Sequence, residues 1–259
     1  MTNGTTGWTA LVLAGARPGV DDFAHSHGTD LKVLIPVGGE AMVRRPVAAL
    51  LASPWIAAVR VVSQYPERVG AVLPADPRLT VEHSRTTIAA TLQALCNDPA
   101  AQWPVLVTTA DHALLDQGMI DDFCARARGA DVAIGFVERK SLLDRLPTSR
   151  RTWIRFRGGA YSGANLFLLS SPKVAPAIAL WRGVEEDRKK SWRVLSAMGP
   201  LFLLGAAFRL LSIDQAARRI GRRLGLNVRA VVMTNPLAAV DVDKPDDHAL
   251  VEALLAGRA

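Results

Sequence analysis

The alternation of short apolar runs with segments of helical periodicity constrains the fold of this 259-residue chain more than any other feature. Residues 9–14 (TALVLA) form a β-rich apolar run before a loop that contains Gly15 and Gly19. Residues 105–109 (VLVTT) form a similar run shortly before Asp111. Because strands that alternate with helices build sheets covered on both faces, the pattern predicts an α/β fold with a doubly wound, mostly parallel sheet.

The predicted elements follow one another through short connections. Strands are expected at residues 9–14, 58–63, 81–84, 105–109, 131–137 and 228–233. Helices are expected at residues 40–53, 86–95, 120–127 and after 245, where Gly257 can end the last helix. Runs at 152–156 and 161–169 around Gly158-Gly159 predict a β-hairpin. We expect one domain over residues 1–259, with a basic helical insertion at about 172–225.

The composition excludes several classes of protein. Apolar residues make up 49% of the chain and charged residues 21%, which favours a sizeable core over disorder. Cys96 and Cys124 have no CxxC spacing, which argues against a disulfide scaffold and a structural zinc site. The N-terminus lacks a signal-peptide pattern, and the longest apolar stretch, 200–208, is short of the ~20 residues of a spanning helix. We therefore expect a soluble, cytoplasmic protein.

The first two candidate motifs lie near the N-terminus. In residues 11–19 (LVLAGARPG), glycine allows backbone N–H groups to approach a phosphate, although a plain strand-to-helix turn would look similar. The segment is neither GxGxxG nor a Walker loop. Lys32 precedes the segment IPVGGE and offers a point charge to a triphosphate, with an ordinary surface lysine as the alternative.

Carboxylates follow two later apolar runs. Asp111 directly follows the 105–109 run, at the place where α/β sheets present ligand groups, and a carboxylate there suits Mg²⁺. Asp241 and Asp243 follow another apolar run, interpreted as a strand, and alternation would direct both to the same side. Turn-forming or helix-capping roles are the alternatives. We expect His112, beside Asp111, to pack or hydrogen-bond locally.

These segments, in this order, resemble the MobA-like NTP transferases, which are GT-A-type nucleotidyltransferases. The shared motifs are the LAG loop, a lysine before Pro-Val-Gly-Gly, TTAD and DVDKPDD, and the resemblance covers nearly the whole chain except about 172–225. The resemblance implies nucleotide-binding roles for Leu13, Ala14, Gly15, Ala16, Lys32, Ser84, Arg85 and Thr87. It also implies catalytic roles for Lys32, Asp111 and Arg17, acceptor-binding roles for Gly163 and Asn165, and a metal site at Asp111 and Asp243, with Asp241 as the alternative ligand.

Two departures affect the first loop. Ala16 stands where the family usually has a second glycine, and Arg17 is displaced from the usual arginine position. The identity of the phosphate-binding arginine therefore stays open.

The resemblance implies a Mg²⁺-dependent enzyme that transfers a nucleoside monophosphate from an NTP to a small phosphorylated acceptor and releases pyrophosphate. Likeness to small cytidylyltransferases favours CTP as the donor and a phosphorylated polyol or acid, such as a headgroup precursor, as the acceptor. The alternatives are a molybdopterin or sugar-1-phosphate nucleotidyltransferase and, from another class, a non-catalytic NTP-binding regulatory module associated with a membrane. The sequence leaves the oligomeric state open, a homodimer included.

Residues 182–229 form a basic block with eleven Lys/Arg and four acidic residues, so the net charge of +7 arises there. Bulky aromatic residues such as Trp192 and Phe202 lie among the charges. We predict an anionic partner, either the acceptor or an anionic membrane that the protein contacts peripherally at its inner face. No nucleic-acid-binding motif accompanies the charge, so we expect no nucleic acid partner. A helical segment with a solvated basic face is the alternative.

Overall fold

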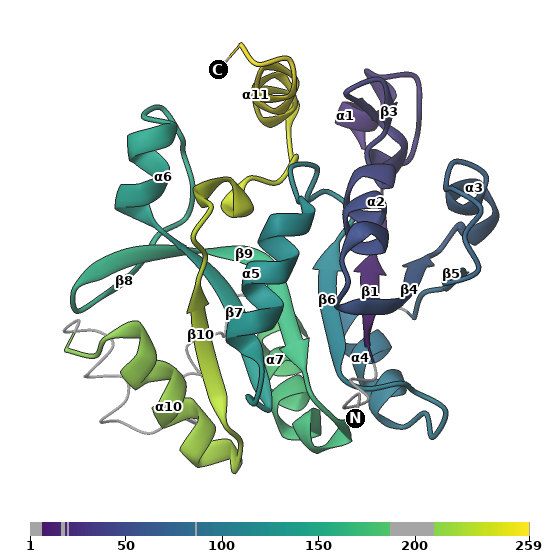
Figure 1. Ribbon diagram of the computed structural model, residues 1–259. Helices are drawn as coiled ribbons and strands as arrows, with labels where there is room; N and C mark the ends of the chain where they lie inside the picture. The colour runs from purple at the N-terminus through teal and green to yellow at the C-terminus, as the bar shows by residue number, and fades with distance from the viewer. Residues whose placement is uncertain (1–6, 17–18, 20, 86, 187–209, 259) are drawn as a thin grey trace.

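The computed structural model describes residues 7–16, 19, 21–85, 87–186 and 210–258. An eight-stranded sheet forms its centre (Figure 1). The strands of this sheet are β1 (Trp8–Leu13), β4 (Ile56–Ser63), β5 (Leu79–His83), β6 (Val105–Thr109), β7 (Val132–Glu138), β8 (Ile154–Phe156), β9 (Gly159–Leu169) and β10 (Val228–Val232). A small second sheet pairs β2 (Pro36–Val37) with β3 (Glu40–Ala41).

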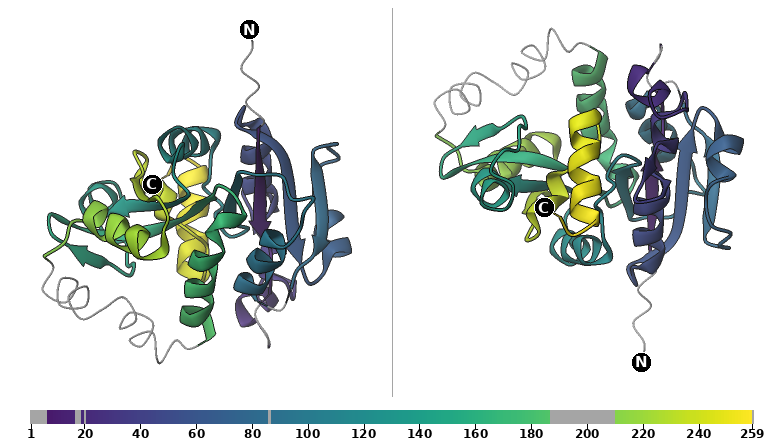
Figure 2. Two further views of the ribbon diagram at one scale, coloured as in Figure 1. Left: turned by 90° about the horizontal axis from the view of Figure 1, so that it is seen from below. Right: turned by 90° about the horizontal axis from the view of Figure 1, so that it is seen from above.

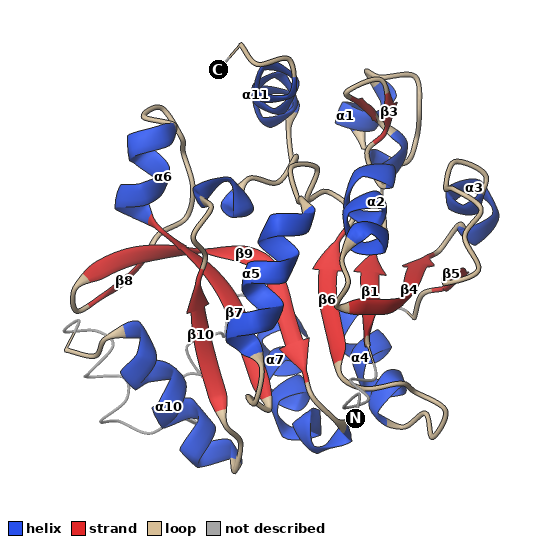
Figure 3. Ribbon diagram, viewed as in Figure 1, coloured by secondary structure: helices blue, strands red, loops and turns tan. Residues whose placement is uncertain are grey.

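The sheet has the order β10-β7-β9-β6-β1-β4-β5, and β8 pairs with β9 (Figure 3). The pairs β10–β7, β6–β1, β1–β4 and β4–β5 are parallel. Strand β9 runs antiparallel to both β6 and β7, and it forms the predicted hairpin with β8. The doubly wound, mostly parallel sheet is therefore confirmed. Strand β9 joins the two parallel halves and brings its own residues into the middle of the sheet.

Helices and 3₁₀ turns connect the strands. The α-helices are α1 (Asp22–His25), α2 (Arg44–Ala52), α3 (Pro66–Gly70), α4 (Ile88–Cys96), α5 (Gln117–Ala127), α6 (Arg139–Arg145), α7 (Ala175–Glu186), α10 (Ile213–Leu224) and α11 (Pro245–Leu255). The 3₁₀ turns are η1 (Lys32–Leu34), η2 (Pro172–Val174) and η3 (Pro236–Ala239). No helix within the described ranges is long and apolar enough to cross a membrane.

Helices cover both faces of the sheet (Figures 1 and 2). Because side chains alternate along a strand, Ala10 and Val12 of β1 belong to the larger hydrophobic cluster, which also contains Phe123 of α5, while Leu11 belongs to the other cluster. This second cluster includes Leu92 of α4, together with residues of α7 and α10. The sheet is thus buried on both sides, as its continuous apolar strands require.

Some predicted boundaries were wrong. Residues 40–53 do not form one helix, because Gly38 and Gly39 adopt positive φ angles and turn the chain into β3. Helix α2 starts only at Arg44. The sequence analysis also missed α1, α3 and α6, which are too short to show helical periodicity. The predicted helix at 86–95 begins at Ile88, where the Thr87 hydroxyl accepts a hydrogen bond from Ala90 N and caps it.

Candidate active site

Lys32 and two aspartates meet at the carboxyl end of the parallel strands. Asp111 lies two residues after β6, and Asp243 lies in the segment that leads into α11. Lys32 Nζ lies 2.8 Å from Asp111 Oδ2 and 2.5 Å from Asp243 Oδ1. Figure 1 shows α11 and the α1 region beyond the arrowheads of β1 and β6, so segments from both ends of the chain surround this edge.

Backbone contacts fix the position of Asp111. Ala110 N donates to Leu13 O over 3.0 Å, which joins the turn after β6 to the end of β1. Val242 N donates to Asp111 O over the same distance and holds the Asp241–Asp243 segment beside it. The Thr109 hydroxyl donates to Asp111 Oδ1 at 2.6 Å. Both oxygens of the Asp111 carboxylate therefore have a defined orientation before any ligand binds.

The electrostatics of Lys32 reflect its two partners. Burial alone would lower the pKa of Lys32, but the attraction of Asp111 and Asp243 outweighs it, and the pKa lies above its ordinary value. The lysine is therefore positively charged at neutral pH and offsets part of the charge of the two aspartates. Such a group can interact with an incoming phosphate as a point charge without a change of protonation.

Asp241 takes different partners from Asp243. Its carboxylate accepts hydrogen bonds from Arg151 Nη2 at 2.5 Å and from Asn165 Nδ2 at 3.0 Å. The side chains of Arg151 and Asp241 are only 17% and 16% exposed. Burial raises the pKa of Asp241, with a further contribution from Asp111 and Asp243, while Arg151 opposes the shift. The prediction that these aspartates follow a strand was wrong: they follow η3, a 3₁₀ turn after β10.

A bulge in β9 directs Asn165. The φ angle of Asn165 is 49°, in the left-handed region. Among the described residues, no other non-glycine residue has a positive φ. The pairing of β9 with β7 is irregular at this point, because Ile134 pairs with Phe167 and Phe136 with Gly163. Bulges of this kind re-aim side chains, and here the amide of Asn165 reaches Asp241. Gly163, the other predicted acceptor residue, has open space around the position of a side chain.

The predicted first nucleotide loop follows β1 at the same edge of the sheet. Ala14 N donates to Val62 O at 2.9 Å, and Ala16 N donates to Gln64 Oε1 at 2.8 Å. Leu13 ends β1, Gly15 lies in the described part of this loop, and Arg17 lies outside the described residues. Gln64, just after β4, thus sets the course of the loop.

The predicted second loop lies after β5, next to β4 in the sheet. Ser84 N donates to Ser63 O, and Arg85 N donates to the Thr91 hydroxyl. Thr87 caps α4, so its hydroxyl already has a structural partner. The Ser84 hydroxyl is buried and has no hydrogen-bond partner in the described structure. The Ser84 hydroxyl therefore has unused hydrogen-bonding capacity, and the Arg85 side chain is exposed.

His112 is fully packed inside the molecule. Its side chain is 1% exposed, and neither ring nitrogen has a hydrogen-bond partner. The Ala238 backbone faces the ring outside ordinary hydrogen-bonding geometry. Burial lowers the pKa of His112 to about 4, so the ring is neutral at pH 7. The expectation that His112 packs or hydrogen-bonds locally is confirmed, because the ring is packed inside the molecule.

Histidines elsewhere at this edge join α1 to α11. The rings of His27 and His248 lie 4.7 Å apart, and Phe23 packs 5.0 Å from His27. His248 Nε2 also lies 2.7 Å from Pro36 O. His27 is partly buried in this contact. The contact connects the segment before Lys32 with the helix after Asp243.

The carboxylates suit a metal ion that needs few protein ligands. No group of three or more His, Cys, Asp or Glu side chains gathers in metal-binding geometry among the residues that the structure describes. Mg²⁺ takes one or two carboxylates and completes its coordination with water and phosphate oxygens. Asp111 and Asp243, which already share one cation, form such a pair. The residues present therefore fit Mg²⁺ accompanied by a phosphate ligand.

Comparison with known proteins decides the family. The model of the MobA-like NTP transferase domain matches residues 10–200. The chain belongs to this family. The match begins within β1, includes Lys32, Asp111 and strand β9, and ends before α10. No curated protein sequence matches the chain at a significant level.

Solved structures agree with this assignment. A hypothetical transferase from Thermus thermophilus is 28% identical, with a TM-score of 0.78 over 93% of this chain and 99% of its own. A 4-diphosphocytidyl-2C-methyl-D-erythritol synthase from Anaerococcus prevotii is 11% identical, with a TM-score of 0.58 over 96% and 98% of the two chains. The 2-C-methyl-D-erythritol 4-phosphate cytidylyltransferase of Francisella tularensis is 10% identical, with a TM-score of 0.56 over 94% and 97%. At such low identity, the last two show a shared nucleotidyltransferase fold.

Sequence reasoning missed two residues at this edge of the sheet. Gln64 and Arg151 reach their partners Ala16 and Asp241 across 48 and 90 positions of the chain. Neither residue lies in a recognisable motif. Several arginines lie near Arg151 in the sequence, so no local signal could have singled it out.

Proposed function

We propose that this protein catalyses the Mg²⁺-dependent transfer of a nucleoside monophosphate from an NTP to a small phosphorylated acceptor, with release of pyrophosphate. The observation that carries the proposal is the contact of Lys32 with both Asp111 and Asp243 beside the glycine loop of an NTP transferase fold. A cation between two carboxylates is the arrangement expected where a metal–triphosphate complex binds, because the same charges can then pair with metal and phosphate.

The chemistry needs little from the protein besides positioning and charge. One oxygen of the acceptor phosphate attacks the α-phosphorus of the NTP, the bond from the α-phosphorus to the bridging oxygen breaks, and the electron pair leaves with pyrophosphate. The acceptor phosphate is largely ionised at neutral pH, since its second pKa is about 6, so no general base is required. Catalysis then depends on in-line placement of the two reactants and on charge neutralisation.

Each part of the site has a role in this proposal. Backbone N–H groups of the loop at Gly15 donate hydrogen bonds to the phosphates, and the positive charge of Lys32 pairs with the triphosphate. Mg²⁺, when bound by Asp111 and Asp243, would neutralise charge on the α-phosphate and on the departing pyrophosphate. Asn165 and Gly163 lie on the acceptor side, where the Asn165 amide also orients Asp241.

CTP is the donor that we propose. Support comes from the family and from the shared fold with cytidylyltransferases, and the Ser84 hydroxyl offers an unused hydrogen-bonding group on the second loop. For the acceptor we propose a phosphorylated polyol or acid. There are three alternatives. The acceptor is a molybdopterin, the acceptor is a sugar 1-phosphate, or the protein is a non-catalytic NTP-binding module. One assay gives a different result for each.

That assay combines each of the four NTPs and Mg²⁺ with a panel of phosphorylated acceptors and follows pyrophosphate release. The proposal predicts release that requires acceptor and Mg²⁺ together, with CTP preferred. Preference for GTP with molybdopterin, or for another NTP with a sugar 1-phosphate, would correct the substrates and keep the reaction. Tight NTP binding without turnover on any acceptor would contradict the proposed catalysis.

A further inference from the structure

Helix α10 presents its arginines from a fixed position. Its inner side carries the small buried residues Ala216, Ala217 and Gly221, and a Cβ at Gly221 would lie 2.4 Å from Leu226 O. The helix therefore packs tightly against the segment that leads into β10. A capping box at Ser212 and a left-handed Gly225 define its two ends. The backbone that carries the side chains of the outer side is therefore held in place.

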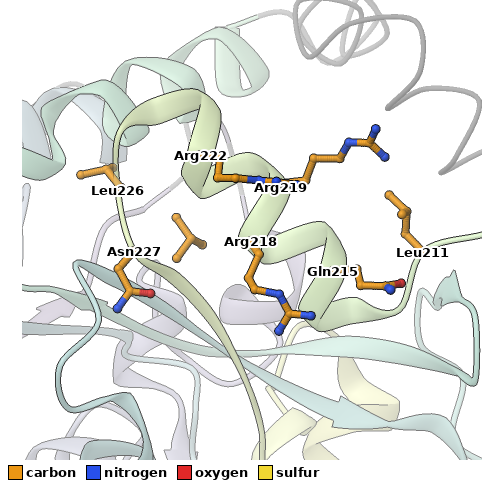
Figure 4. Close-up of a pocket in the computed structure, with 8 residues that line it drawn as sticks. Leu211, Gln215, Arg218, Arg219, Arg222, Leu226 and Asn227 are labelled. Carbon is orange, nitrogen blue, oxygen red and sulfur yellow. The ribbon is translucent and has the colours of Figure 1, made fainter.

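A surface pocket of about 540 Å³ lies between α10 and this segment (Figure 4). Arg218, Arg219 and Arg222 line it, together with the polar side chains of Gln215 and Asn227. Three arginines on one helix give this part of the surface a positive charge, and Figure 4 shows Arg218 and Arg219 extending from the helix in different directions. The amides of Gln215 and Asn227 add neutral hydrogen-bonding groups beside them.

Ion pairs to the arginines of this pocket are missing among the residues that the structure describes. No carboxylate in the described part of the chain forms an ion pair with Arg218, Arg219 or Arg222. Elsewhere the fold does supply such partners, as in the pairs Arg60–Glu82 and Arg151–Asp241. Arg218 and Arg222 are also four positions apart, where like charges on a helix repel. The described part of the fold thus gathers positive charge here and supplies no carboxylate to pair with it.

The pocket is remote from the candidate active site. It lies beside the start of β10, whereas Lys32, Asp111 and Asp243 lie at the carboxyl end of the sheet. Figure 1 shows α10 beside the tail of β10 and α11 at the opposite end of the molecule. An anion in the pocket therefore cannot be the acceptor that reacts at the carboxylate–lysine centre. This separation rules against the acceptor as the anionic partner of the α10 arginines.

We propose that the α10 pocket is a second anion site, which binds a phosphate group through Arg218, Arg219 and Arg222. Guanidinium forks match phosphate oxygens with paired hydrogen bonds, which makes arginine clusters suited to this ligand. The phosphate could belong to a free phosphorylated metabolite or to an anionic lipid headgroup. The inference does not depend on nucleotidyl transfer and goes beyond it.

The test measures binding of inorganic pyrophosphate by calorimetry at low salt without divalent cations. Wild type is compared with the triple variant Arg218→Gln, Arg219→Gln, Arg222→Gln. The matched control removes the same charge from exposed arginines outside the pocket: Arg155→Gln, Arg223→Gln, Arg258→Gln. None of the six residues lies at the carboxylate–lysine centre, so any binding there contributes equally to all three proteins. Circular dichroism checks that each variant is folded.

We expect the pocket variant to bind pyrophosphate about tenfold or more weakly, since each charged hydrogen bond lost is worth a factor of this order. The control should stay within about threefold of wild type. Equal weakening in both triple variants would show a general attraction to a basic surface and would overturn the proposal. Wild type that binds no more tightly than the pocket variant would overturn it as well.

A second arm identifies the source of the phosphate. Flotation with phosphatidylglycerol-containing vesicles, against phosphatidylcholine vesicles, is run on the same three proteins. Vesicle binding that the pocket variant loses and the control keeps supports a lipid headgroup as the ligand. Pyrophosphate binding without vesicle binding supports a free phosphorylated ligand. If vesicle binding falls equally in both triple variants, and both bind pyrophosphate with equal affinity, the proposal that the α10 pocket binds a phosphate group is contradicted.

Discussion

Two regions of this molecule use cationic side chains in opposite ways. At the carboxyl end of the sheet, Lys32 lies between Asp111 and Asp243, and Arg151 pairs with Asp241, so every one of these charges has a partner of opposite sign. On α10, three arginines line one pocket, and no described carboxylate pairs with them. The first region resembles a site that is organised in advance for a metal–triphosphate complex. The second is the site for which we propose an anion from outside the chain.

The largest effect is expected from removal of one charge in the paired region. Asp111→Asn should lower kcat by about 10³-fold, because Asp111 is proposed to bind the metal and also positions Lys32; loss of one electrostatic group alone costs about 10²–10³. Asp116→Asn is the matched control, since Asp116 caps α5 and asparagine caps a helix about as well. Near-normal turnover of Asp111→Asn with Mg²⁺ would contradict the proposal that the paired region binds a metal–triphosphate complex through Asp111. We expect the same loss from Asp243→Asn.

The next effect concerns the cation between the two aspartates. Lys32→Ala should lower kcat by about 10²-fold, because the lysine offsets phosphate charge in the transition state. Lys173→Ala, in an exposed pair with Asp131, serves as the control and should change little. Steady-state kinetics separates kcat from KM. An effect restricted to the KM of the acceptor would move Lys32 from the triphosphate to the acceptor site.

A third prediction tests whether the pair of Arg151 and Asp241 is structural. Arg151→Gln should lower the free energy of unfolding by about 1–3 kcal/mol, because Asp241 then keeps a largely buried charge with fewer partners. The double variant Arg151→Gln, Asp241→Asn should cost less than the sum of the two single variants. Urea denaturation of the four proteins measures this. Strictly additive losses would show that the two side chains do not stabilise each other.

The smallest effect is expected at an exposed pair near the paired region. Asp30 accepts two hydrogen bonds from Arg68, and these lower the pKa of Asp30 to about 2. Since the folded pKa lies below the ordinary value of 3.8, the stabilisation is present above pH 3.8 and is lost as the pH falls toward 2. The Tm of Arg68→Gln should lie slightly below that of wild type at pH 6, and the gap should close at low pH. A gap that is constant with pH would refute this origin.

Much of the fold and part of the candidate site were accessible from the sequence. Strand β6 and the turn to Asp111 were visible because apolar residues stop abruptly at a carboxylate. The segment at Asp243 was recognised from its acidic residues, but η3 was mistaken for a strand, because a 3₁₀ turn of alanine and leucine is as apolar as a strand. The contacts of Gln64 and Arg151 could not be predicted, since they depend on register and on the β9 bulge and not on local pattern.

The basic block shows a different limit of sequence reasoning. The charge count alone could not separate contact with the acceptor, contact with a membrane and a solvated face. The packing of Gly221 against Leu226 and the position of α10 beside the start of β10 remove the first interpretation for this helix. Five of the eleven basic residues (Arg188, Lys189, Lys190, Arg193 and Arg209) lie outside the described residues, as do Trp192 and Phe202.

The assignment of the metal to Asp111 and Asp243, and not to Asp241, is the central claim of the paired region. Electron paramagnetic resonance of Mn²⁺, as a substitute for Mg²⁺, measures the free ion in the presence of the protein and a non-hydrolysable CTP analogue. Mn²⁺ binding should require the nucleotide, be lost in Asp111→Asn and in Asp243→Asn, and remain within a few-fold of wild type in Asp241→Asn, whose side chain is engaged with Arg151 and Asn165. Binding that survives in Asp111→Asn and disappears in Asp241→Asn would contradict the account.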